Sequence, residues 1–166
     1  MIGSREYAAI ALHYGERTAR RSGERLMRHI DHGLAILSKL GATAAAQRAF
    51  CVHPLVQADA DLAANAACLV ELGDVHVAIL ALEYRRVANA ALSTRELASA
   101  DEIALSPLAE VNDMLIADKV QNRHDFLRHH RDTHPRAEAL ERYFRLWLER
   151  LGVAEARYAE LADVPH

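Results

Sequence analysis

The sequence predicts a single all-α domain, a bundle of about seven to eight helices. Strong helix formers recur along almost the whole chain, and apolar residues follow helical spacing, as at Leu26, Ile30, Leu34 and Leu37. No segment of the sequence alternates apolar and polar residues as a half-buried strand would. The length of 166 residues fits one domain and is sufficient for a hydrophobic core.

Capping and breaking residues set the expected helix boundaries. We expect helices over residues 4–20, 24–40, 44–52, 59–72, 75–91, 108–130, 136–151 and 154–162. Ser22-Gly23 interrupts the first, Gly41 ends the second in the usual C′ position, and Thr43 can cap the third. Pro54 disfavours the helical region of the backbone at His53 and predicts a break there.

The second half of the chain follows the same rules. Gly73-Asp74 predicts a turn, with Asp74 as the N-cap of the fifth helix. Residues 93–107 form the least regular segment, which we expect to be a loop with a short helix. The seventh helix carries Tyr143, Phe144 and Trp147, and their packing against the bundle is favoured over a partner surface.

Composition narrows the class of protein. With 51% apolar and 26% charged residues the chain reads as globular rather than disordered, and a formal net charge of -3 argues against a nucleic-acid-binding surface. No apolar run approaches the ~20 residues of a membrane span, and no signal-peptide pattern opens the chain, so we expect a cytoplasmic protein without a membrane partner. Cys51 and Cys68 form no CxxC pair and are expected to be buried, reduced thiols.

Three polar segments contain the residue types of a metal or phosphate site. They are Arg20-Arg21-Ser22-Gly23 followed by His29, then His53 to Asp59, and then Ala117 to Asn122. Imidazole and carboxylate groups suit a divalent transition-metal ion, which can activate water and offset phosphoryl charge. The arginines could bind phosphate, although a solvated basic face is an alternative.

In order and spacing these segments resemble the HD-domain signature of the RelA/SpoT-type (p)ppGpp hydrolases, H…HDxxED…ADxxxN. His13-Tyr14-Gly15-Glu16, Arg20-Arg21-Ser22-Gly23 and His29 resemble that family's opening motifs, and Ala117-Asp118-Lys119…Asn122 resembles its late signature. The resemblance covers residues 7–123. It implies a single HD-domain-like helical bundle, with residues 136–162 packing on it.

The resemblance also implies a site. One divalent ion, usually Mn²⁺, would be held by His29, His53 and Asp118, which match three of the family's four ligands. Arg20, Arg21, Lys119 and Asn122 would lie near a phosphorylated nucleotide. Asn122 is one helical turn beyond Asp118, so the two side chains share a face.

Three acidic positions depart from the family pattern. Pro54 replaces the aspartate of the HD pair, and Gln57 and Ala58 replace a Glu-Asp pair that would activate water. Gln57 can accept a hydrogen bond but cannot act as a carboxylate base. Asp59, or else Asp61, could serve as the catalytic acid group if the segment shifts by one or two residues.

Two groups of histidines have explanations other than metal binding. His29, His53 and Asp118 could form a buried hydrogen-bonded network without metal. His130 and His134 have the i, i+4 spacing of some zinc sites, but no Cys or Glu completes that pattern. They and the nearby His124 and His129 are better explained as solvated groups at a helix C-terminus.

Three functions therefore stay open at the level of sequence. The first is a catalytically impaired relative, a pseudoenzyme that binds a phosphorylated nucleotide. The second is an active metal-dependent nucleotide phosphohydrolase with a rearranged site. The third is a structural or adaptor module, with a homo-oligomer as one form of it. The arrangement of His29, His53 and Asp118 would discriminate among the three. Close metal-like geometry would favour the enzyme, an empty polar pocket the binder, and a filled pocket the module.

Overall fold

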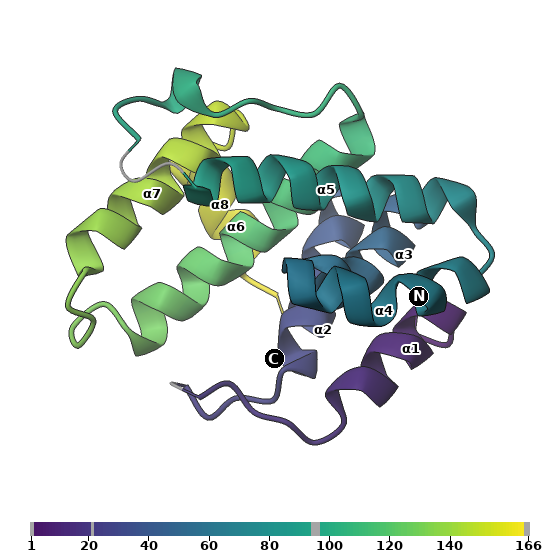
Figure 1. Cartoon of the computed structure of the whole chain (residues 1–166). Coiled ribbons are helices and arrows are strands. Elements are labelled where there is room, and N and C mark those ends of the chain that lie inside the picture. The colour runs from purple at the N-terminus through teal and green to yellow at the C-terminus, as the bar shows by residue number, and fades with distance from the viewer. Residues whose placement is uncertain (1, 21, 94–96, 165–166) are drawn as a thin grey trace.

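The computed structural model describes residues 2–20, 22–93 and 97–164, and these are almost entirely helical (Figure 1). The α-helices are α1 (Arg5–Tyr14), α2 (Met27–Leu40), α3 (Ala44–Val52), α4 (Asp59–Glu71), α5 (Val75–Ser93), α6 (Ala109–His129), α7 (Ala137–Arg150) and α8 (Glu155–Ala162). Two 3₁₀ turns lie between helices: η1 (His53–Val56) between α3 and α4, and η2 (Ala100–Glu102) between α5 and α6. Within the described ranges there is no strand, and the predicted all-α fold is confirmed.

Most of the predicted boundaries rest on the caps that were expected. Thr43 accepts a hydrogen bond from the backbone N–H of Ala46, Asp74 accepts one from Val77, and Gly41 has the left-handed φ of +71°. The predicted short helix between α5 and α6 is η2.

Two backbone predictions were wrong. The first helix does not run to residue 20 but ends at Tyr14, because Gly15 takes a positive φ of 51° and turns the chain out of the helix. The break at Pro54 occurs, yet His53 keeps helical angles, φ -55° and ψ -36°. Pro54 instead occupies the first turn of η1, where its missing N–H costs nothing.

Helix α6 is the centre of the bundle. It contacts α2, α3, α5, α7 and α8, and its middle is buried on nearly every side. The aromatic residues of α7 pack inward as predicted, with Trp147 fully buried and Phe144 against Phe126 of α6. Because α6 is enclosed, polar side chains on it must find partners inside the protein.

Two simpler properties follow from the described residues. No helix among them is both long and apolar enough to cross a lipid bilayer. Cys51 is buried and Cys68 is partly exposed, and both are free thiols.

Candidate metal centre

Three residues predicted as metal ligands come together. His29 lies in the first turn of α2, His53 begins η1, and Asp118 lies in the middle of α6. One potential ligand atom from each lies within 4.8 Å of the other two. His53 and Asp118 are each 4% exposed, so the cluster is largely enclosed.

A chain of hydrogen bonds orients His29. The Asp125 carboxylate can only accept, so the Gln121 amide must donate through Nε2, at 2.6 Å. Gln121 then turns Oε1 toward His29, whose Nδ1–H donates to it at 2.6 Å. This directs Nε2 of His29 toward Asp118, 3.6 Å from Oδ1.

His53 is oriented by the backbone and by two rings. Its Nδ1–H donates to the carbonyl of Phe50 at 2.7 Å, which again leaves Nε2 as the free nitrogen. The Phe50 and Tyr84 rings lie with their centroids 4.7 Å from the His53 ring. Burial, followed by the proximity of His29, lowers the pKa of His53 to about 3, so this imidazole is neutral at ordinary pH.

Asp118 is held as a carboxylate by its neighbours. Lys119 Nζ donates to Oδ2 at 2.7 Å and Asn122 Nδ2 donates to Oδ1 at 2.9 Å. Burial opposes the charged form, but Lys119, His29 and His53 outweigh it and lower the pKa of Asp118 to about 2. Lys119 and Asn122, expected near a nucleotide, therefore hold the predicted ligand carboxylate in this structure.

A glycine on α2 lets the ring of Phe50 approach both imidazoles. A Cβ atom at Gly33 would lie 2.0 Å from Phe50 Cε1, a distance that no side chain tolerates. Phe50 is fully buried, with its ring centroid 5.6 Å from that of His29 and 4.7 Å from that of His53. The missing side chain at Gly33 thus determines where two predicted ligands sit.

The candidate catalytic residues lie outside this cluster. Gln57 donates through Nε2 to Asn89 Oδ1 at 2.6 Å, and Asn89 donates back to the Gln57 carbonyl at 3.0 Å. The Asp59 side chain is 97% exposed and pairs with Arg85. Asp61 accepts from the Ala58 backbone N–H at 3.2 Å, so it caps α4.

The predicted basic group is described only in part. Arg20 is exposed in the segment between α1 and α2, and Arg21 falls outside the described residues. Arg17 lies over the ring of Tyr14, 5.6 Å from its centroid, and donates to the Tyr14 carbonyl. The described part of this segment borders the open side of the bundle (Figure 1).

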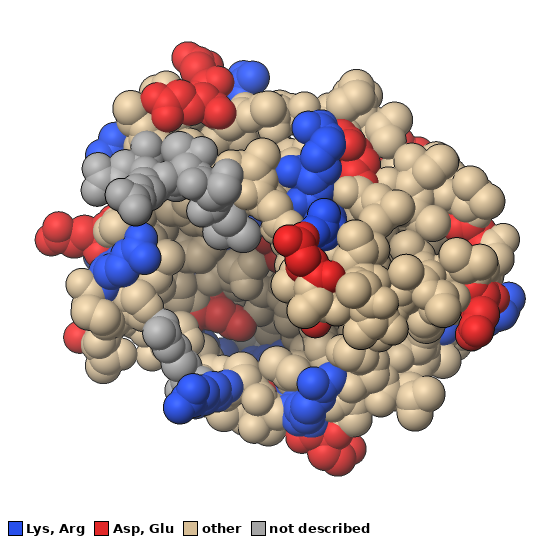
Figure 2. Space-filling model, viewed as in Figure 1, with Lys and Arg blue, Asp and Glu red and all other residues tan. Residues whose placement is uncertain are grey.

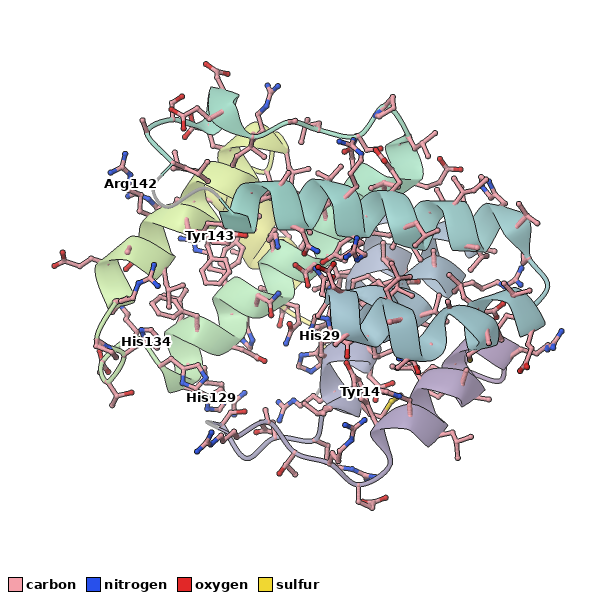
Figure 3. All side chains as sticks on the ribbon, viewed as in Figure 1. Tyr14, His29, His129, His134, Arg142 and Tyr143 are labelled. Atoms are coloured by element: carbon pink, nitrogen blue, oxygen red, sulfur yellow. The ribbon has the colours of Figure 1, made fainter. Side chains whose placement is uncertain are left out.

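The cluster lies beside a hollow in the molecular surface. Figure 2 shows this hollow, with charged side chains in its depth and Lys or Arg side chains on its rim. Figure 3 places His29 at one edge of the same opening and Tyr143 of α7 at the opposite edge. The His29 side chain is 23% exposed, so the cluster is open to solvent on this side.

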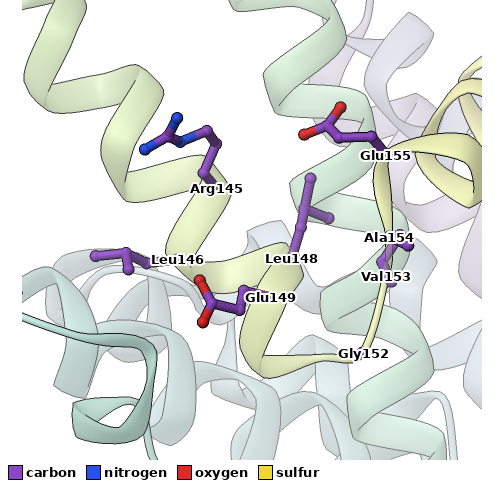
Figure 4. A pocket seen from close by; sticks show the side chains of 8 residues that line it. All are labelled: Arg145, Leu146, Leu148, Glu149, Gly152, Val153, Ala154 and Glu155. Atoms are coloured by element: carbon purple, nitrogen blue, oxygen red, sulfur yellow. The ribbon is translucent and has the colours of Figure 1, made fainter.

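A second hollow lies between α7 and α8 (Figure 4). It is lined by Arg145, Leu146, Leu148, Glu149, Gly152, Val153, Ala154 and Glu155. None of these residues belongs to a predicted site. The histidines near the end of α6 form no cluster of three metal-binding groups among the described residues.

Sequence reasoning missed Gln121, Tyr84 and Gly33. Gln121 is three residues after Asp118, so helical spacing alone could have placed it on the same side of α6. The sequence pointed less clearly to Tyr84, which was recognisable only as a single hydroxyl group on a largely apolar helix. Burial and the nearby Asp118 raise the pKa of Tyr84 well above its ordinary value.

The donor set fits a divalent transition-metal ion. Two imidazoles and one carboxylate are ligands that Mn²⁺ and Zn²⁺ both accept. No family model, curated protein or solved structure matches the chain.

Proposed function

We propose that this chain is a divalent-metal-dependent binding protein for a phosphorylated nucleotide, a catalytically impaired relative of the RelA/SpoT-type HD hydrolases. The convergence of His29, His53 and Asp118 within 4.8 Å carries the proposal. Both imidazoles donate through Nδ1 to fixed acceptors, and this outer hydrogen bonding is typical of metal-ligating histidines.

Three protein ligands leave coordination positions for a small molecule. Structural zinc sites are usually closed by four protein ligands, whereas sites with three accept water or substrate. A bound ion would supply a Lewis acid for a phosphate oxygen. Lys119 and Asn122 would keep Asp118 oriented toward that ion, as their hydrogen bonds to its carboxylate suggest.

Impaired hydrolysis follows from what surrounds the cluster. Water activation needs a base within about 3 Å of the attacking oxygen. Gln57 has no carboxylate and is engaged with Asn89, while Asp59 is exposed and engaged with Arg85. The site therefore combines a set of potential metal ligands with candidate catalytic residues, Gln57 and Asp59, that are engaged elsewhere.

An active hydrolase is the second candidate. The three-ligand arrangement favours it, because open coordination is also what a catalytic metal site needs. It differs from the first candidate in requiring a base from another residue or from the ligand itself. Turnover, rather than binding, separates the two.

Calorimetry with Mn²⁺ and a guanosine tetraphosphate tests both. We expect the wild-type chain to bind the two together, Asp118→Asn to lose binding, and the matched control Asp113→Asn on the same helix to retain it. Anion-exchange separation after incubation should then show unchanged nucleotide. Conversion that His53→Ala abolishes would replace the first candidate by the second, and failure to bind Mn²⁺ in any of these conditions would refute both.

A further inference from the structure

The charges at the proposed metal site follow from its ligands. Ligation through Nε2 uses the nitrogen lone pair, so His29 and His53 would enter the site as neutral groups. Among the described residues, the Asp118 carboxylate is in contact with the Lys119 ammonium, 2.7 Å away. The Asp125 carboxylate contacts the Gln121 amide rather than the cluster itself.

Lys119 cannot withdraw its charge into solvent. Its residue is 5% exposed, and its ammonium lies 5.1 Å from the centroid of the Trp147 ring and 5.8 Å from that of Tyr143. Aromatic faces attract a cation at these distances, and Asp118 holds it from the other side. The ammonium is therefore a fixed part of the site.

A divalent ion bound here would leave two uncompensated positive charges in a largely enclosed place. Burying an uncompensated charge costs free energy because the protein solvates it less well than water does. The Lys119 ammonium would also repel the bound ion more strongly in this low-dielectric environment than it would in water. A phosphate dianion on the open side of the ion would restore neutrality. The partly exposed His29 side of the cluster is where such an anion could approach the ion.

We infer that this site binds a divalent cation and a phosphate monoester dianion as a pair, with Lys119 suppressing binding of the cation alone. The inference rests on the proposed function and deepens it. It makes the phosphate group, rather than the nucleoside, the feature that the site requires. By linkage, the cation must raise affinity for the phosphate monoester by the same factor.

Titration of Mn²⁺ into the protein in three solutions tests this. The solutions contain AMP, adenosine or neither, and AMP differs from adenosine only by its phosphate. We expect Mn²⁺ to bind at least ten times more tightly with AMP, and adenosine to have no effect. Trp147 is the only tryptophan of the chain, so its fluorescence gives a second readout beside the Lys119 ammonium.

Lys119→Met provides the opposite test. Removing the ammonium should strengthen Mn²⁺ binding without AMP about ten-fold and shrink the effect of AMP. Lys39→Met is the matched control, because Lys39 is the only other lysine and lies exposed against the Glu160 carbonyl at 2.9 Å. Lys119→Arg keeps the charge and should keep the dependence on AMP. Circular dichroism checks that each variant is folded.

The outcomes separate the inference from the proposed function. Equal Mn²⁺ affinity with AMP and adenosine would overturn the inference and leave the metal site standing. Unchanged or weaker Mn²⁺ binding in a folded Lys119→Met variant would also overturn it. Absence of Mn²⁺ binding in wild type with AMP and in Lys119→Met alike would overturn both.

Discussion

Two polar clusters join helices in this bundle, and they differ in the chemical groups that they bring together. In the first, Arg48 of α3 donates to Glu6 of α1 at 2.6 Å and to Asp74 at 2.8 Å. Both contacts join opposite charges, and Glu6 is 1% exposed. In the second, His29, His53 and Asp118 bring three potential ligand atoms within 4.8 Å of one another, and each histidine contacts an acceptor outside the group through Nδ1.

Under the proposed function, this difference separates a structural network from a ligand site. Burial and charge are common to both clusters, so neither property identifies function. The first cluster pairs opposite charges, whereas two imidazoles and a carboxylate are groups that a divalent transition-metal ion accepts as ligands. That set of donor groups, brought together from three separate elements, distinguishes the second cluster.

The largest effect should come from Asp118→Asn. This change leaves the buried Lys119 ammonium without its carboxylate and should cost about 3–5 kcal/mol of unfolding free energy. Urea unfolding followed by circular dichroism measures it. If Asp118 is a metal ligand, the variant should also lose Mn²⁺ binding in calorimetry. If the cluster only stabilises the fold, the variant should lose stability and the Mn²⁺ affinity should not change.

A double variant sharpens that result. Asp118→Asn with Lys119→Met removes both charges, so most of the lost stability should return. Mn²⁺ binding should not return, because a ligand is gone. Recovery of Mn²⁺ binding in the double variant would show that Asp118 is not a ligand.

Glu6→Gln should affect the structural network with a smaller cost, about 1–3 kcal/mol at neutral pH. The hydrogen bond from Arg48 outweighs burial and lowers the pKa of Glu6 below its usual 4.5. Protonation therefore favours the unfolded chain, and this contribution is present above about pH 4.5 and lost as the pH falls further. The variant should flatten the acid limb of a stability profile, whereas exposed Glu149→Gln should not. Weaker Mn²⁺ binding in Glu6→Gln would contradict the separation of the two clusters.

The fold could be predicted from the sequence because its signals are local. Gly41, Thr43 and Asp74 each act through the neighbouring backbone, and each cap formed where it was expected. The first helix was extended too far because residues after Gly15 are good helix formers. There the positive φ of one glycine overrode propensity.

The site was only partly predictable. Two of the residues that meet in it, His53 and Asp118, lie on separate elements, and the resemblance to a known signature supplied their pairing. The engagement of Gln57 with Asn89, and of Lys119 with Asp118, depends on rotamers and packing that spacing does not encode. Gly33 carried no visible signal, because its role is space for the Phe50 ring.

Gly33→Ala tests that role. Its Cβ would overlap the Phe50 ring, and such overpacking costs about 1–3 kcal/mol. The higher helix propensity of alanine offsets up to about 1 kcal/mol of that cost. We expect a net loss of about 1–2 kcal/mol in urea unfolding, together with weaker Mn²⁺ binding because Phe50 positions both imidazoles. Unchanged Mn²⁺ affinity would mean that the imidazoles are positioned without Phe50.

The smallest effect on stability should come from Asp125→Asn. This variant tests whether the outer hydrogen bonds of the metal cluster control which nitrogen of His29 carries the proton. The Asp125 carboxylate only accepts, and it thereby forces Gln121 to present Oε1 to His29. An asparagine can donate as well, so the Gln121 amide can turn and move the His29 proton to Nε2, the ligand atom. Unfolding free energy should change by less than about 1 kcal/mol because the Asp125 side chain is partly exposed.

Mn²⁺ affinity of the Asp125→Asn variant should fall about ten-fold, and nitrogen-detected NMR should report the other His29 tautomer. A retained Nδ1–H tautomer with unchanged affinity would mean that the outer hydrogen bonds merely pack the cluster, as those of Arg48 do.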